Sequence, residues 1–65
     1  MQGKVKLFNK EKGYGFIVME DGTEAFFHYS QLIMEGFRTI EADTEVSFDL
    51  ISTERGNQAR NVRKM

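Results

Sequence analysis

Residues 12–29 read KGYGFIVMEDGTEAFFHY, and this stretch decides the fold class. Residues 14–19 and 25–29 are two short runs rich in aromatic and β-branched side chains, which favour β-strands. The Asp21-Gly22 pair between them is typical of a tight turn, because it tolerates the positive backbone φ angles that such turns require. The stretch therefore predicts a β-hairpin with strands at 14–19 and 25–29.

Three further strands are predicted on either side of this hairpin. Residues 4–8 and 44–52 alternate polar and apolar side chains with the period of two that is typical of strands. Residues 58–63 form the fifth run, after a polar turn. The segment 30–33 could form one helical turn capped by Ser30, which precedes a longer loop. Five short strands at roughly ten-residue spacing predict a small all-β sandwich or barrel.

The composition excludes several classes of protein. The chain has 65 residues with no cysteine and one histidine, so disulfides and thiolate metal sites are absent and one histidine cannot build a zinc site alone. No apolar run approaches the ~20 residues of a membrane span, and no signal-peptide pattern opens the chain. We expect a single domain over residues 1–65, cytoplasmic and monomeric, without a metal, a cofactor or a membrane partner.

The charges are sorted along the chain. Residues 1–16 carry four lysines and one acid, residues 17–54 carry nine acids and one arginine, and residues 55–65 carry four cations and no acid. The formal net charge of −1 therefore hides two basic ends. If the fold brings these ends together, one face becomes basic and the opposite side acidic.

Alternation sorts the strand side chains into two faces. The predicted core consists of Val5, Leu7, Ile17, Ala25, Phe27, Val46, Phe48, Leu50 and Val62. The second face interleaves rings with cations: Lys4, Lys6, Phe8, Tyr14, Phe16, Phe26 and His28. Aromatic rings beside lysines are typical of a surface that stacks single-stranded bases and neutralises phosphates.

Other interpretations of this face remain open. The same rings could dock a peptide, which would make the chain a protein-interaction module, or the barrel could act only on a ribosome. Catalysis is not expected, since His28 and Ser30 lie close in sequence but a small barrel offers no deep pocket for an oriented base and an oxyanion site.

The segment Lys12-Gly13-Tyr14-Gly15-Phe16-Ile17 fits the first part of a ribonucleoprotein motif. The chain is too short for the domain with two long helices in which that motif is usual. Taken from residue 3 to its end, the sequence instead resembles the bacterial cold-shock proteins. The other matching segments are Gly3–Lys6, Phe8-Asn9, Phe26–Ser30, Glu35–Phe37, Val46–Phe48, Arg55-Gly56, Gln58-Ala59 and Asn61-Val62.

The resemblance implies a five-stranded antiparallel β-barrel of the OB type that binds single-stranded RNA and DNA with little sequence preference. It also implies an RNA chaperone that melts weak secondary structure and affects transcription and translation. The family's stacking residues fall on Phe8, Tyr14, Phe16, Phe26, His28, Tyr29 and Phe37. Its polar and backbone contacts fall near Lys6, Asn9, Lys12, Arg38, Arg55 and Gln58.

Ala25, Phe27 and Asn57 depart from the family pattern, and three other departures from that pattern or from simple alternation bear on the binding face. Leu7 stands where the family usually has a solvent-side tryptophan, so stacking at this candidate site position is weakened, although alternation places Leu7 in the core. Tyr29 lies inside by alternation but on the binding face by resemblance, which we follow. Arg60 replaces a residue that is commonly small and adds a charge near the presumed groove.

Overall fold

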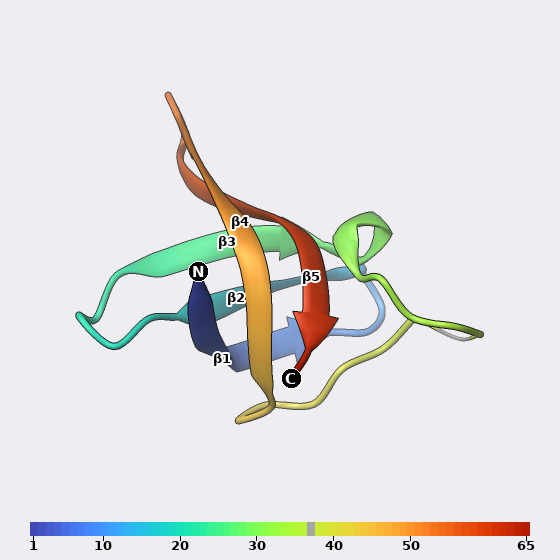
Figure 1. Ribbon diagram of the computed structural model, residues 1–65. Helices are drawn as coiled ribbons and strands as arrows, with labels where there is room; N and C mark the ends of the chain where they lie inside the picture. Colours follow the sequence, from blue (N-terminus) through green and yellow to red (C-terminus); the bar gives the residue numbers. More distant parts are fainter. Residues whose placement is uncertain (37) are drawn as a thin grey trace.

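The computed structural model describes residues 1–36 and 38–65, and the predicted stacking residue Phe37 lies outside the described residues. The elements are β1 (Gln2–Asn9), β2 (Tyr14–Val18), β3 (Glu24–His28), the 3₁₀ turn η1 (Tyr29–Gln31), β4 (Glu45–Thr53) and β5 (Gly56–Lys64). All five predicted strands are present, and β1 and β5 are longer than predicted (Figure 1).

The strands form a closed barrel in the order β1-β2-β3-β5-β4, which confirms an all-β barrel of the OB type. The prediction of a purely antiparallel sheet is wrong in one respect, because β3 and β5 pair in parallel through Phe26 and Gln58. The chain leaves β3 through η1 and a long loop, and then adds β4 and β5 as a hairpin across the first three strands (Figure 1). That route brings β5 beside β3 in the same direction.

The β2–β3 turn follows the sequence prediction. Gly22 has a φ of +87°, and its amide donates to the Met19 carbonyl at 2.9 Å. The Asp21 side chain accepts a hydrogen bond from the Thr23 amide at 2.9 Å, which lowers the pKa of this carboxyl below its usual value. This bond stabilises the fold above the carboxyl's unfolded pKa and is lost as the pH falls through the lowered value.

The predicted helical turn begins one residue earlier than expected and has a different cap. It covers Tyr29–Gln31, and its N-cap is His28 rather than Ser30. The His28 Nδ1 accepts a hydrogen bond from the Ser30 amide at 3.2 Å and lies 2.9 Å from the Ser30 hydroxyl. The imidazole therefore takes the place of the usual Ser or Asp oxygen at the start of the turn.

The predicted core is largely confirmed, but alternation assigned two residues of β1 to the wrong face, Leu7 and Phe8. Its buried apolar residues are Val5, Ile17, Met19, Ala25, Phe27, Leu32, Ile40, Val46, Phe48, Ala59 and Val62. Leu50 is partly buried and packs against this core. Leu7, in contrast, is 42% exposed, although alternation placed it inside.

A bulge in β1 explains the error at Leu7. The register between β1 and β2 shifts between Val5 and Leu7, so that Leu7 lies opposite Phe16, and Phe8 opposite Gly15. An extra residue in one strand moves every later side chain to the other face. Phe8, which alternation placed with the outer rings, instead stacks on core residue Phe27 with ring centroids 5.8 Å apart.

Candidate nucleic-acid interface

Three aromatic rings of β2 and β3 form a cluster on the outer surface of the barrel. Phe16 lies opposite Phe26 in the antiparallel register, and their ring centroids are 5.7 Å apart. The ring centroid of Tyr14 lies 5.6 Å from that of Phe26 and 6.4 Å from that of Phe16. The three rings are half-buried, each at an angle to its neighbours, so each presents part of its surface to solvent.

Two further residues extend this cluster along the register of the sheet. Leu7 of β1 lies opposite Phe16, and His28 of β3 lies opposite Tyr14. Both side chains are exposed. We call this set of five outer side chains the ring face: Leu7, Tyr14, Phe16, Phe26 and His28.

The ring face is separate from the core because the strand period gives β2 and β3 a second set of apolar residues. Ile17, Ala25 and Phe27 point inward from the same two strands and are at most 1% exposed. Exposed apolar clusters of this kind usually mark interaction sites in soluble proteins.

Tyr29 continues the aromatic surface beyond the end of β3. It is 44% exposed, so it lies outside the core and not inside as alternation predicts, and its ring centroid lies 4.5 Å from that of His28. Its amide donates to the Gly13 carbonyl at 2.8 Å. A Cβ at Gly13 would lie 2.6 Å from the Tyr29 ring, and the φ of +73° there also favours glycine.

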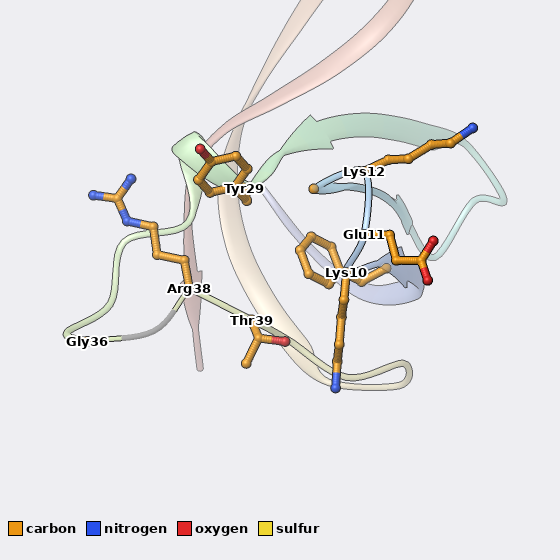
Figure 2. A pocket seen from close by; sticks show the side chains of 9 residues that line it. Lys10, Glu11, Lys12, Tyr29, Gly36, Arg38 and Thr39 are labelled. Carbon is orange, nitrogen blue, oxygen red and sulfur yellow. The ribbon is translucent and has the colours of Figure 1, made fainter.

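A hollow of about 460 Å³ lies beside Tyr29. We call it the Tyr29 groove, and its lining residues are Phe8, Lys10, Glu11, Lys12, Gly13, Tyr29, Gly36, Arg38 and Thr39. Figure 2 shows the amines of Lys10 and Lys12 extending away from it in different directions. The Thr39 hydroxyl is buried and has no hydrogen-bond partner among the described residues. A groove with an aromatic wall, lysine and arginine side chains in its lining and an unpartnered hydroxyl among the described residues suits a base attached to a phosphate.

The predicted polar residues do not gather in one cluster as the rings do, and each has different neighbours. The Lys6 ammonium donates to the Glu24 carboxylate at 2.8 Å, the one ion pair within the described part of the chain. Asn9 lies opposite Tyr14, and its side chain accepts from the Lys12 amide at 3.0 Å, so it holds the β1–β2 turn. Arg38 lines the Tyr29 groove.

The remaining two predicted contacts come from the β4–β5 hairpin. Gln58 lies beside Phe26, next to the ring face. Arg55 lies in the turn that joins Thr53 to Gly56, beyond the residues that pair with β3. The structure therefore brings Gln58 to the rings but does not place Arg55 in contact with them.

The sequence interpretation missed Ile51. Ile51 lies in β4 opposite Gln58 of β5, and it is half-buried. It therefore extends across the sheet the row of residues formed by Leu7, Phe16, Phe26 and Gln58. The apolar character of Ile51 was its only sequence signal, because its link to the rings runs through Gln58 of β5, whose pairing with Phe26 is set by the closure of the barrel.

Within residues 1–36 and 38–65, no helix has the length and apolar character needed to cross a membrane. In the same two ranges, no three His, Cys, Asp or Glu side chains gather in a way that could hold a metal ion.

Comparisons with known proteins agree on one family. The model of the 'Cold-shock' DNA-binding domain matches residues 1–65. Cold shock protein CspB of Bacillus caldolyticus is 52% identical over 64 residues, which cover 98% of this chain and 97% of that protein. Cold shock-like protein CspC of Bacillus cereus is 48% identical over the full length of both chains.

A solved structure shows the same fold. The drosophila Unr CSD456 structure superposes on this chain with a TM-score of 0.74 and 25% sequence identity. The match covers 98% of this chain and 26% of that one, so the similarity concerns one part of a longer protein.

Proposed function

This chain belongs to the cold-shock domain family, and from that premise we propose that residues 1–65 form one domain that binds single-stranded RNA and DNA with little sequence preference. The observation that carries the proposal is the ring face, where three rings cluster within 6.4 Å on the outside of a barrel that has a separate apolar core.

Base stacking supplies the main contact. Every base has a π-face, so stacking on a ring contributes about 1–3 kcal/mol per base without selecting a sequence. The proposed apolar and aromatic contacts are Leu7, Phe8, Tyr14, Phe16, Phe26, His28, Tyr29 and Phe37. Leu7 stacks less well than an aromatic residue would, and Phe8 contributes only through its exposed part in the Tyr29 groove.

Polar groups around the rings orient the strand and neutralise its phosphates. The proposed polar contacts are Lys6, Asn9, Lys12, Arg38, Arg55 and Gln58. Among them, Lys6 must exchange its bond with Glu24 for one with phosphate. A strand of roughly 6–7 nucleotides is within the range known for a single OB fold.

An RNA chaperone activity would follow from this preference for unpaired bases. A protein that binds the open form of a weak hairpin and not its paired form shifts the equilibrium toward the open form. We propose that a monomer acts in this way in the cytoplasm, without catalysis, and thereby modulates transcription and translation.

The test is a titration of the protein with a short oligothymidine, followed by tyrosine fluorescence and by amide chemical shifts. The chain has two tyrosines and no tryptophan, and both tyrosines lie at the proposed site, so their emission reports directly on binding. We expect saturable changes at the ring face, and much weaker changes with a duplex of equal length. A peptide-docking module would show no saturable response to the oligonucleotide, and that result would refute the proposed function.

A further inference from the structure

We propose that Arg60 is a further phosphate-binding residue, through which the path of the nucleic acid continues from the ring face onto β5. This inference rests on the proposed function and adds a contact to it. The sequence placed the charge of Arg60 near the presumed groove but did not count it among the nucleic-acid contacts, and its neighbours depend on the way in which the barrel closes.

The register places Arg60 next to the end of the ring face. Phe26 pairs with Gln58 in the parallel β3–β5 contact. In a parallel pair, residues two positions further along both strands are neighbours on the same face, because side chains alternate with a period of two. Two positions on, these residues are His28 and Arg60.

The burial pattern of β5 shows which way Arg60 points. Ala59 and Val62 are each 1% exposed and belong to the core, whereas Arg60 is exposed. Arg60 therefore projects from the outer surface, the side on which His28 is also exposed.

The segment after β3 is hydrogen-bonded to β5 close to Arg60. The backbone amide of Asn61 donates to the Gln31 side-chain oxygen at 3.4 Å. The backbone amide of Ile33 donates to the Val62 carbonyl at 2.8 Å. These bonds hold η1, with Tyr29 at its start, beside the part of β5 that carries Arg60.

The charge of Arg60 is available to a ligand. Asp49 of β4 lies opposite Arg60 of β5, but its carboxylate accepts a hydrogen bond from the side-chain amide of Asn61 at 2.8 Å. Arg60 takes part in no ion pair with any of the residues that the structure describes. Lys6, on the other side of the ring face, differs in this respect because its ammonium forms an ion pair with Glu24.

A guanidinium at this position suits a phosphate well. Its planar donors bind two phosphate oxygens at once, and it is less strongly hydrated than an ammonium. Lys6 lies on β1 and Lys12 in the turn after it, whereas Arg60 lies on β5, at the other side of the β2–β3 hairpin. Bases stacked on the rings would then have cations on both sides of the strand.

Arg63 provides a matched control on the same strand. It is exposed like Arg60, but the register between β4 and β5 shifts before it, and it pairs with Ser47. Ser47 in turn pairs with Gln2 at the start of β1, away from the ring face. Arg60→Gln and Arg63→Gln thus remove the same charge from two different surfaces.

The experiment measures oligothymidine affinity against salt for the wild type, Arg60→Gln, Arg63→Gln and Arg60→Lys, with thermal unfolding as a check of the fold. Each phosphate contact to a single strand contributes about 0.7 to the log–log slope. Between 50 and 200 mM salt, wild-type affinity should therefore fall about 2.6-fold more than that of Arg60→Gln. Arg63→Gln should keep the wild-type slope, and Arg60→Lys should restore it.

The outcomes separate this inference from the function on which it rests. Equal slopes for Arg60→Gln and the wild type, or equal losses in both glutamine variants, would show that Arg60 touches no phosphate while the domain still binds nucleic acid. No binding by the wild type would instead overturn the proposed function, and the role of Arg60 with it.

Discussion

At the scale of single residues, neighbouring aromatic side chains have opposite roles. Phe26 and Phe27 are adjacent in sequence, yet Phe26 is half-buried in the ring face and Phe27 is 1% exposed in the core. Strand geometry separates them, because consecutive side chains point to opposite faces. The two residues therefore form a natural pair for separating binding from stability.

Replacing Phe16 or Phe26 with alanine should weaken oligonucleotide binding by about 1–3 kcal/mol with little loss of stability, because each ring stacks a base and neither fills the core. Titration and thermal unfolding of the same variants measure the two effects. Phe27→Ala is the control and should cost about 3–5 kcal/mol of folding free energy. Unfolding of the Phe16 or Phe26 variant would place that ring in the core instead.

The ion pair between Lys6 and Glu24 leads to a prediction of increased affinity, whereas the alanine variants above lose affinity. Removing the carboxylate with Glu24→Gln frees the Lys6 ammonium, so affinity for single strands should rise. Because Lys6 already contacts a phosphate in the wild-type complex, the gain comes from the bond with Glu24 that no longer has to be broken, and the log–log salt slope should stay close to the wild-type value. Stability should change by less than about 1 kcal/mol, since both partners are well exposed.

The double variant Glu24→Gln with Lys6→Gln serves as the control for this effect. It should lose the gain in affinity, because no freed ammonium remains. A gain that persists in the double variant would mean that Glu24 acts by repelling phosphates directly and not through Lys6.

At the scale of elements, the bulge in β1 determines which side chains the first strand contributes to each surface. It moves Leu7 to a place opposite Phe16 and turns Phe8 toward Phe27. Without the bulge, Leu7 would join the core and Phe8 the ring face. One extra residue therefore sets how far the stacking surface extends over β1.

The bulge predicts that Leu7→Trp increases affinity for oligothymidine by about 1–3 kcal/mol, because an indole beside Phe16 offers another base a stacking partner. The new tryptophan also provides a fluorescence signal that should be quenched on binding. Leu7→Ala should leave the melting temperature almost unchanged. A loss of about 2–5 kcal/mol in Leu7→Ala would indicate that Leu7 is a core residue.

At the scale of the whole molecule, barrel closure places one strand from each basic end of the chain beside the hairpin that carries the rings. β1 lies on one side of the β2–β3 hairpin and β5 on the other, so cations distant in sequence flank a common surface. The formal net charge of −1 therefore gives no indication of the local potential at the ring face.

Salt dependence is the molecular consequence of this arrangement. Contacts of Lys6, Lys12, Arg38 and Arg55 with four phosphates predict a log–log slope near −2.8, or a fall of about 50-fold between 50 and 200 mM salt. The further contact proposed for Arg60 steepens the slope to about −3.5 and the fall to about 130-fold. Binding measured by fluorescence at several salt concentrations gives the slope. An affinity that does not depend on salt would leave stacking alone as the source of binding.

The five strands, the Asp21-Gly22 turn and most of the core could be predicted without a structure, because they depend on local periodicity and turn chemistry. Local pattern also picked out Tyr14, Phe16 and Phe26 as outer rings. Resemblance, and not alternation, correctly put Tyr29 on the outside.

The exposure of Leu7 and the parallel β3–β5 pairing could be known only from the folded chain, and so could the neighbour of Arg60 on β3. A bulge leaves no mark in the hydrophobic pattern before the partner strand is known, and a single slip in register reverses every face that follows. Likewise, the residues that meet across the last seam of a barrel are far apart in sequence, so closure and not local preference brings them together.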